Sequence, residues 1–467
     1  MINKTNSHVF ISTNEYEARR NTLLANMQPN SLAIISAAPE VTRSNDTEYH
    51  FRQNSDFFYL TGFEEPDAIL VLSNQSETSA NQFFINACGD NSASAIFVRP
   101  KDEIAEVWHG RRLGKIDAPT ALKIDAAFNL EELPELLPEL INGHECLYYE
   151  HGHHPKADAS IAQAIQACKH SPKQAKTAPK STVDVSQLLH SMRLVKSSQE
   201  INVMRTSANI ACEAHKQAMK MSAEGVNEYQ LEAQILYCFA LYGARHAAYN
   251  TIVGSGENAC ILHYTENKDE LKNGNLVLID AGAEYNGYAS DITRTFPVNG
   301  QFSSAQKDIY ELVLDIQKQC IDRFRPGVTI AQVMLFVVEE TIKGLLSLNI
   351  LSGSLEECIE KEAHKQYFMH GLGHYLGIDV HDVGNYKEAG QDKPLEPGIV
   401  ITVEPGIYIS SSSEAPEKYH GIGVRIEDNI VITNEGCEVL TDNAPKEVKD
   451  IEAMMKQPLN LDIPKLF

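Results

Sequence analysis

The sequence lacks the long hydrophobic segments that membrane proteins need. No apolar run among its 467 residues approaches the roughly 18 residues of a membrane-spanning helix. The first residues, Met1 to Arg20, contain no apolar core of the kind found in secretory signals, so we expect none. Hydrophobic residues make up 43% of the chain and charged residues 22%, as in ordinary globular proteins. This composition excludes disordered, collagen-like and coiled-coil proteins, and the length predicts two or three domains.

Patterned cysteines and an excess of basic residues are also missing. The nine cysteines are scattered and form no C-x-x-C pair, which is typical of buried, reduced thiols and predicts a cytoplasmic protein. The 40 Lys and Arg residues are outnumbered by 63 Asp and Glu, which gives a net charge of −23. A surface this acidic repels nucleic-acid phosphates and anionic lipids, so we expect neither nucleic acid nor a membrane as a partner. Part of the acidic excess is available instead to neutralise cations inside a site.

Several common catalytic signatures are absent or incomplete. The sequence has no G-x-S-x-G elbow, no Walker A motif and no H-E-x-x-H motif. Gly421-x-Gly423 lacks the third glycine and the following helix of a dinucleotide-binding site. No cysteine lies in a recognisable nucleophile context. Serine hydrolase, P-loop and nicotinamide chemistry are therefore not indicated.

The chain changes character after its first third. Before this point, apolar runs alternate with turn residues and predict strands at Leu32–Ser36, Ala68–Leu72 and Phe83–Asn86 in a mixed α/β domain. Residues 169–180 read KHSPKQAKTAPK and have no apolar periodicity, which predicts a surface connection. We place a domain boundary shortly after it, between residues 182 and 183. A solvated loop within a single domain is the alternative.

The remainder of the chain alternates helices with hairpin-linked strands. Helix starts are predicted by N-cap or capping-box residues at Ser197, Asn227, Ser303, Thr329 and Ser354. Strands are predicted at residues 248–253, 275–285, 288–297, 399–409 and 423–433. Because the helices segregate from the hairpins, the fold class is α+β rather than a doubly wound sheet.

Two aspartates are expected to meet across one of these hairpins. Asn286-Gly287 is a strong signal for a two-residue hairpin turn. In the resulting register Asp280 lies opposite Thr293, and Asp280 and Asp291 share one face as diagonal neighbours. Two like charges in that position repel unless a cation lies between them. The alternative is a pair of solvated carboxylates, which is weakened because Asp280 ends an apolar run that looks buried.

Histidines and further carboxylates are concentrated in three later segments. The stretch FMHGLGHYLGIDVHDVG contains His370, His374 and His381, and its glycines indicate a loop or strand rather than a helix. Three histidines beside small residues suggest a metal ligand and its supporting groups. Glu404 ends an apolar strand, and Glu427 interrupts another. Taken singly, each glutamate is better explained as an ordinary edge or surface residue.

Together these residues form a donor set suited to metal ions. It comprises four carboxylates and one imidazole: Asp280, Asp291, His374, Glu404 and Glu427. Four negative charges match two divalent ions, and oxygen-rich ligation with one nitrogen favours Mn²⁺, with Co²⁺ or Zn²⁺ as alternatives. Two such ions about 3.5–4 Å apart can hold a bridging hydroxide and clamp both reacting oxygens.

At these residues the sequence resembles the pita-bread metallopeptidases and, within them, the aminopeptidase P family of Xaa-Pro aminopeptidases. The matching stretches are NTIVGSGENACILHYTEN, LVLIDAGAEYNGYASDITRTFPVNG, FMHGLGHYLGIDVHDVG, ITVEPGIYI and GIGVRIEDNIVIT. In the first half, TRSNDTEYHFRQNSDFFYLTGF and VWHGRRLG extend the resemblance and favour this family over prolidase. The resemblance implies a pita-bread catalytic domain, residues 183–467, preceded by a smaller α/β domain, residues 1–182.

The resemblance also assigns roles to the metal centre and its neighbours. It implies a dinuclear manganese site formed by the five residues above, with Asp291 and Glu427 bridging both ions. Glu404 would also act as general base for the bridging water. His381 would donate a proton or polarise the scissile carbonyl, and His263 would contact the carbonyl region.

Substrate recognition is implied to involve both halves of the chain. His370 and Arg425 would line a proline pocket, with Tyr408 as a further candidate for its wall. In the first half, Asp46 would pair with the substrate's free amino group. Trp108, the only tryptophan, would close the cleft from a neighbouring subunit. Family members assemble as homotetramers through their first domains, so we expect the same here.

The implied reaction releases the N-terminal residue from peptides that have proline at the second position. The bond before proline is a tertiary amide without an N–H, which general peptidases handle poorly. Prolidase, which accepts only Xaa-Pro dipeptides, shares the ligands and is the main alternative. Methionine aminopeptidase usually lacks the large first domain. A non-enzymatic pita-bread binding module and a metal-free creatinase-type amidinohydrolase are further alternatives, but both lose the metal ligands that are retained here.

Overall fold

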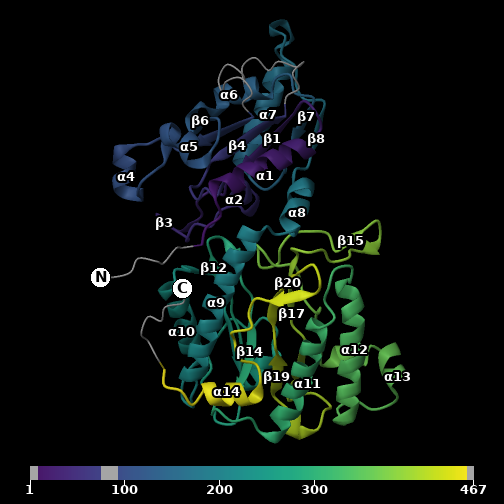
Figure 1. Cartoon of the computed structure of the whole chain (residues 1–467). Coiled ribbons are helices and arrows are strands. Elements are labelled where there is room, and N and C mark those ends of the chain that lie inside the picture. The colour runs from purple at the N-terminus through teal and green to yellow at the C-terminus, as the bar shows by residue number, and fades with distance from the viewer. Residues whose placement is uncertain (1–8, 75–92, 460–467) are drawn as a thin grey trace. The chain divides into compact units, whose positions relative to one another are not determined.

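A computed structural model describes residues 9–74 and 93–459, which form two compact units (Figure 1). The first unit is Ile11–Met192, and the second begins at Arg193 and also includes residues 9 and 10. The boundary expected between residues 182 and 183 falls inside a strand of the first unit's sheet. The strand predicted at Phe83–Asn86 lies outside the described residues.

The first unit is built on a mixed six-stranded sheet of order β6-β5-β4-β1-β7-β8. Its strands are β1 (Ser31–Ser36), β4 (Ile69–Asn74), β5 (Ser94–Val98), β6 (Ala126–Asn129), β7 (Cys146–Tyr148) and β8 (Ser181–Val183), and a separate hairpin joins β2 (Thr42–Ser44) to β3 (Thr47–Glu48). The strands predicted near residues 32 and 68 are confirmed as β1 and β4, which pair antiparallel. β1, β7 and β8 run parallel to one another.

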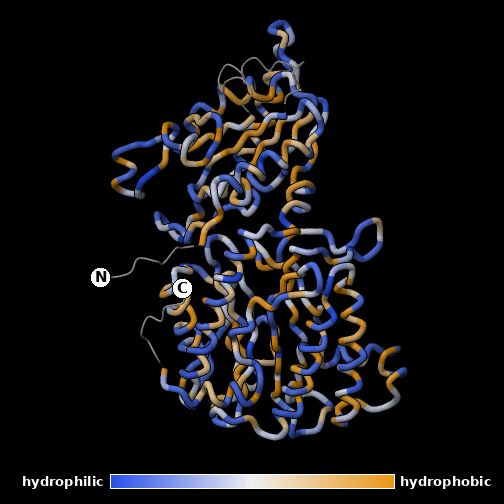
Figure 2. The backbone as a smooth tube through the Cα atoms, in the orientation of Figure 1, coloured by the Kyte–Doolittle hydropathy of each residue, from blue (hydrophilic) through white to orange (hydrophobic). Residues whose placement is uncertain are grey.

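Helices pack around this sheet and complete a mixed α/β unit. They are α1 (Thr13–Asn26), α2 (Ser55–Thr61), α4 (Glu103–His109), α5 (Gly114–Leu122), α6 (Leu133–Ile141), α7 (Pro155–Lys169) and α8 (Ser186–Leu194), with short 3₁₀ turns η1 (Leu130–Glu132) and η2 (Pro172–Gln174). Buried residues of β1, β4 and β5 pack against α6 and α7 to form one hydrophobic core. Figure 2 shows hydrophobic residues along these central strands.

The helices of the second unit begin at the predicted residues. They are α9 (Ser198–Met221), α10 (Glu228–Leu241), α11 (Ser304–Ile321), α12 (Ile330–Ser347), α13 (Leu355–Glu360) and α14 (Val448–Met454), with 3₁₀ turns η3 (Gly256–Cys260), η4 (Ala363–Gln366) and η5 (Glu417–Tyr419). All five predicted N-terminal signals are confirmed, and each forms a complete capping box. Caps are predictable because the side chain satisfies amide groups only three residues away.

The strands of this unit are shorter than the sequence predicts. They are β9 (His246–Ala247), β10 (Ile252–Ser255), β11 (Leu276–Asp280), β12 (Ala283–Tyr285), β13 (Tyr288–Ala289), β14 (Thr293–Pro297), β15 (Lys387–Glu388), β16 (Gln391–Asp392), β17 (Val400–Val403), β18 (Gly406–Ile409), β19 (Ile422–Arg425), β20 (Asp428–Ile432) and β21 (Cys437–Val439). Four predicted long strands are each divided in two by two or three residues. The predicted register is confirmed, with Asp280 opposite Thr293.

These interruptions let one chain segment take part in two sheets. β11 pairs with β10 and β14, whereas β12, two residues later, pairs with β9 and β13. β17 pairs with β20, whereas β18 and β19 form their own ladder. Apolar periodicity could not reveal the breaks, because residues on both sides of each are equally buried.

Paired helices flank these small sheets. α9 packs on α10 and against β12 and β13, while α11 packs on α12 and against β17 to β19 (Figure 1). The α11–α12 side encloses a second hydrophobic core with β17 and β20. The second unit is therefore α+β, as predicted. No helix among residues 9–74 and 93–459 has the length and apolarity required to cross a membrane.

Candidate active site

A pocket of about 520 Å³ lies among the broken strands of the second unit. Its lining includes all five residues of the predicted donor set, and also His263, His370, His381 and Arg425. Asp46 and Trp108 belong to the first unit. Asp46 is exposed in the turn between β2 and β3, and Trp108 is exposed on α4.

The strand breaks place the carboxylates in the pocket. Asp280 is the last residue of β11, and Asp291 lies between β13 and β14. Glu404 follows β17 directly, and Glu427 lies between β19 and β20. Since each of these residues stands where a ladder ends, its side chain can turn inward without interrupting a regular sheet. His374 enters on a loop that approaches β17 closely, because Gly373 has no side chain: a Cβ there would lie 2.0 Å from the carbonyl oxygen of Thr402.

Asp280 and Asp291 are brought together as predicted, and a tyrosine links them. The Tyr249 hydroxyl lies 2.5 Å from an oxygen of each carboxylate. A hydroxyl has one proton and can donate to only one acceptor at a time. The hydroxyl therefore donates to one carboxylate at a time while it lies beside both. Arg425 Nη2 donates to the other Asp280 oxygen at 2.6 Å.

Three carboxylates, those of Asp291, Glu404 and Glu427, lie near the His374 ring. Nδ1 of His374 donates to the carbonyl of Tyr375 at 2.9 Å, which directs Nε2 into the pocket. Nε2 lies 3.4 Å from Asp291 Oδ2 and 3.6 Å from Glu404 Oε1. Asp291, His374 and Glu427 each offer one potential ligand atom, and these three atoms lie within 4.8 Å of one another. This spacing suits a metal ion held between them.

The electrostatics of this donor set are those of a cation site. Burial, followed by repulsion from neighbouring carboxylates, raises the pKa of Glu427 well above its usual range. Burial likewise raises the pKa of Glu404 to about 7 and is the main cause of the raised pKa of Asp291. Burial alone would lower the pKa of His374, but the hydrogen bond and attraction of Asp291 outweigh it and raise that pKa to about 9. The described side chains around the four carboxylates therefore carry too little positive charge to balance them, and a pair of divalent ions would supply the missing charge.

A directed chain of hydrogen bonds supports one wall of the pocket. Arg425 Nη1 donates to the Tyr408 hydroxyl at 3.0 Å, and this hydroxyl lies 2.8 Å from His370 Nε2. Nδ1 of His370 donates to the carbonyl of Gly371, so Nε2 of a neutral ring accepts from Tyr408. Burial, followed by repulsion from Arg425, lowers the pKa of His370 to about 4, which keeps it neutral. Tyr408 is buried behind His370 and does not line the pocket itself.

His263 and His381 present exposed rings at the pocket. The ring of His381 stands at 77° to that of His374, with 4.3 Å between centroids. Burial, followed by repulsion from His374 and His263, lowers the pKa of His381. Its imidazole is therefore mainly neutral at neutral pH and can donate a hydrogen bond without carrying a charge.

Sequence analysis did not identify several residues that support this site. Thr293 donates to Glu427 at 2.7 Å, and Thr402 donates to Glu404 at 3.1 Å. Asn429 holds the backbone of Asp291 through both its amide oxygen and its amide nitrogen. Tyr249 was also missed. Their only signal in the sequence is that each lies within two residues of a candidate ligand or of a quoted motif.

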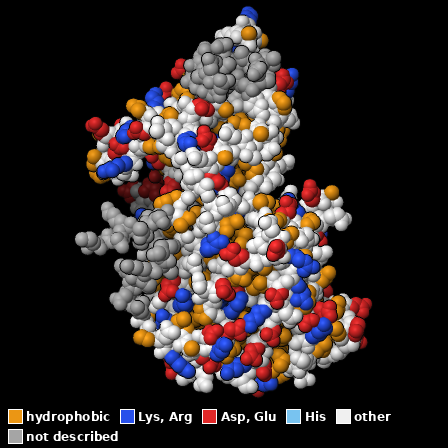
Figure 3. Space-filling view, in the orientation of Figure 1, with side chains coloured by type: hydrophobic (Ala, Val, Ile, Leu, Met, Phe, Trp, Pro, Cys, Tyr) orange, Lys and Arg blue, Asp and Glu red, His pale blue; other side chains and the backbone are white. Residues whose placement is uncertain are grey.

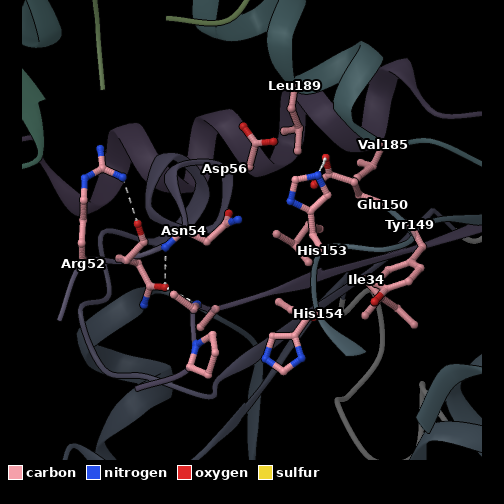
Figure 4. A pocket seen from close by; sticks show the side chains of 16 residues that line it. Ile34, Arg52, Asn54, Asp56, Tyr149, Glu150, His153, His154, Val185 and Leu189 are labelled. Carbon is pink, nitrogen blue, oxygen red and sulfur yellow. Dashed lines mark hydrogen bonds and ion pairs between the residues drawn. The ribbon is translucent and has the colours of Figure 1, made fainter. Parts of the chain in front are cut away.

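A second pocket, of about 210 Å³, lies in the first unit (Figure 4). Its polar groups largely satisfy one another. The Gln53 amide accepts from two backbone amides and donates to two carbonyls, and His153 lies 3.0 Å from Glu150. Among the described residues, a cluster of three potential metal ligands is found only in the second unit. The chemistry is therefore assigned to the larger pocket.

Comparison with known proteins agrees with this geometry. Residues 202–434 match the model of metallopeptidase family M24, and residues 16–148 match the aminopeptidase P N-terminal domain. Xaa-Pro aminopeptidase of Escherichia coli is 48% identical over 95% of this chain and 98% of its own length. The chain belongs to the aminopeptidase P family of M24 metallopeptidases. Human Xaa-Pro aminopeptidase 3 is a more distant member, 34% identical over 96% of this chain and 87% of its own.

Solved structures of this aminopeptidase P family share the whole architecture. Zinc-substituted E. coli aminopeptidase P in complex with product has a TM-score of 0.91 and 48% identity, covering 96% of this chain and 98% of its own. Proline aminopeptidase P II from Yersinia pestis has the same TM-score, with 49% identity over 95% of this chain and 99% of its own. Both predicted parts of the fold, the pita-bread domain and the preceding α/β domain, are thereby confirmed.

Proposed function

We propose that the chain is an aminopeptidase that releases the N-terminal residue from peptides with proline at the second position. One observation carries this proposal: a cation-binding donor set and four further histidine and arginine side chains line a single pocket in an aminopeptidase P family fold. The residues proposed to hold two divalent ions are Asp280, Asp291, His374, Glu404 and Glu427. The oxygen-rich set favours Mn²⁺.

When bound, the two divalent ions supply Lewis acidity toward the scissile carbonyl and lower the pKa of a water. Glu404 is proposed as the general base. Its carboxylate lines the pocket beside the other proposed ligands, where it can accept a proton from a water held there. Arg425 and Thr293 hold Asp280 and Glu427 in place through hydrogen bonds.

His381 and His263 are proposed to contact the scissile carbonyl region. Because the pKa of His381 is lowered, its neutral imidazole is better suited to polarising the carbonyl by a hydrogen bond than to delivering a proton as an imidazolium. His370 is proposed to wall the proline pocket, with Tyr408 and Arg425 fixing its ring from behind. A rigid, neutral wall suits a proline ring, which has no N–H to bond.

Substrate choice is tested with three peptides at saturating Mn²⁺. Ala-Pro-Ala should lose its first residue. Ala-Ala-Ala should be cleaved poorly, because it has no proline ring to fill the proposed proline pocket. Ala-Pro separates this proposal from the prolidase alternative. Cleavage of the dipeptide alone would make the chain a prolidase, and equal cleavage of both tripeptides would make it a general aminopeptidase.

Metal dependence is tested by chelation followed by stepwise return of Mn²⁺, Co²⁺ or Zn²⁺. Activity should disappear on chelation and should return most fully with Mn²⁺. Activity that survives complete removal of bound metal would contradict the proposal and would favour the metal-free amidinohydrolase alternative.

We further propose a homotetramer that forms through the first unit, with Asp46 and Trp108 completing a neighbouring subunit's substrate site. In support, α4 and α5 present a large exposed apolar surface: Ile104, Val107, Trp108 and Ile116 are each at least 75% exposed. Apolar patches of this kind usually mark interaction sites.

The acidic net charge argues against nucleic acid as a partner, and on the face in Figure 3 basic side chains are interspersed with acidic ones. All described cysteines are unpaired, which supports a cytoplasmic location.

A further inference from the structure

His381 stands at the pocket with little to hold its ring. It is exposed, its ring contact is with His374, and the described residues provide its ring with no hydrogen bond. A histidine that must meet a substrate carbonyl needs a defined position, since misplacement by about 1 Å can cost on the order of 10²-fold in rate. The position of this ring must therefore come from the backbone on either side of it.

The next residue, Asp382, is held by two buried cations. Arg193 Nη2 donates to Asp382 Oδ1 at 2.6 Å, and Lys196 Nζ donates to Oδ2 at 2.8 Å. The three side chains are only 1–3% exposed. Asp379, at 2.7 Å from the same Arg193 nitrogen, supplies the second negative charge. Charge-assisted bonds of this length, excluded from water, fix the aspartate strongly.

Lys196 is part of a backbone frame that leads to the metal pocket. The backbone amide of Lys196 donates to the carbonyl of Gly398 at 2.9 Å, and Val195 forms a β-bridge with Ile399. This segment leads directly into β17, at whose end Glu404 stands. Lys196 is therefore anchored to the segment that leads into the strand placing the proposed general base, and Arg193 lies three residues earlier, at the end of α8.

Hydrogen bonds within the loop from His374 to His381 tie its two ends together. The amide of Asp382 donates to the carbonyl of Tyr375 at 2.9 Å, and Nδ1 of His374 donates to the same carbonyl. Gly377 lets the loop close over the ion cluster, because a Cβ there would lie 2.1 Å from Asp382 Oδ2 and 2.9 Å from Lys196 Cε. His374 and His381 thus stand side by side at the two ends of one anchored loop.

We propose that Asp382, locked by Arg193 and Lys196, is the positioning residue for His381. The inference rests on the substrate-facing role proposed above for His381. Asp382 itself is buried and does not line the pocket, so it acts only through the loop. The cluster sets where the imidazole meets the scissile carbonyl, and it leaves the coordination of metal by His374 unchanged.

A double-mutant cycle tests this coupling. Asp382→Asn keeps the size of the side chain and removes the charge that the two cations share. The single variant should bind metal fully and lose about 10–10²-fold in kcat, with KM changed by less than about threefold. In a His381→Ala background the same substitution should cost no more than about threefold, because the group that it positions has already been removed.

Two further variants keep the test decisive if Asp382→Asn folds poorly. Lys196→Met leaves the Arg193–Asp382 pair in place and should lower kcat, whereas Lys196→Arg should retain more activity because it restores a donor to Asp382. Tyr310→Phe is the matched control: it removes a buried hydrogen bond to the carbonyl of Lys446 in the same unit. It should lower the Tm and leave kcat unchanged in both backgrounds.

The possible results separate this inference from the proposed function. Equal, multiplicative losses in the wild-type and His381→Ala backgrounds would overturn the positioning role while leaving the role of His381 intact. Wild-type kcat in Asp382→Asn or in Lys196→Met would overturn it as well. If His381→Ala itself kept full turnover, the role proposed for His381 would fail, and the inference would fail with it.

Discussion

Replacing Asp291 by asparagine should have opposite effects on the metal-free and the metal-loaded protein. The substitution preserves the size of the side chain and removes one of four buried negative charges. In the metal-free protein burial raises the pKa of Asp291, so its ionised form opposes folding at neutral pH. The neutral amide removes that penalty, and the metal-free variant should unfold at a higher temperature than the metal-free wild type.

Metal binding should weaken sharply in the same variant. Two unit charges about 4 Å apart interact by about 4 kcal/mol at an effective dielectric constant of about 20. A divalent ion interacts more strongly than a unit charge, so loss of one ligand charge should lower metal affinity by at least about 10³-fold, since about 1.4 kcal/mol corresponds to a factor of ten. For the wild type, Mn²⁺ at about 100 times its Kd should stabilise the fold by about 2.7 kcal/mol, or roughly 5–10 °C. At the same Mn²⁺ concentration the variant should show almost no such shift.

The assay combines metal analysis, thermal unfolding with and without chelator, and turnover of Ala-Pro-Ala. Asp392→Asn is the matched control, because it makes the same chemical change in a half-exposed carboxylate that pairs with Lys387. This control should behave as wild type in all three measurements. An Asp291→Asn variant with wild-type metal content, turnover and metal-induced Tm shift would refute the dinuclear site.

Three further predictions concern other parts of the molecule. His381→Ala should retain metal and lose about 10²–10⁴-fold in turnover; loss of bound metal instead would make His381 a ligand. The metal-free protein should lose stability from about pH 4.5 to 9, because the folded-state pKa of Glu404 is raised from 4.5 to about 7 and that of His374 from 6.5 to about 9. A raised pKa in the folded state means that the protonated side chain stabilises the fold at low pH, and this stabilisation is lost as the pH rises through the folded-state pKa. A Tm that stays constant over this pH range would contradict the prediction. Trp108→Glu should reduce the assembly to smaller species in sedimentation, and an unchanged tetramer would exclude α4 from the interface.

Local signals in the sequence were sufficient for the elements that surround the site. Ser303 and Thr329 begin helices because a capping side chain contacts backbone amides only three residues away. The Asn286-Gly287 turn follows from the positive φ that both residues adopt, and it set the register that brought Asp280 opposite Thr293. Residue types and their spacing also nominated four carboxylates and three histidines of the pocket, whereas His263 was nominated only by the family resemblance. Each of these features depends on neighbours in the chain.

Only the tertiary structure decided how the ends of the strands are used. The predicted strand at residues 399–409 is two strands that belong to different sheets, and Glu404 reaches the pocket because the ladder stops there. Hydropathy has no signal for such a break, since the residues on both sides are buried. The supporting groups were likewise hidden, because Tyr249 meets Asp291 from 42 positions away and Lys196 meets Asp382 from 186 positions away. A side chain's partners at such separations are set by the packing of whole elements, which no local pattern of residues encodes.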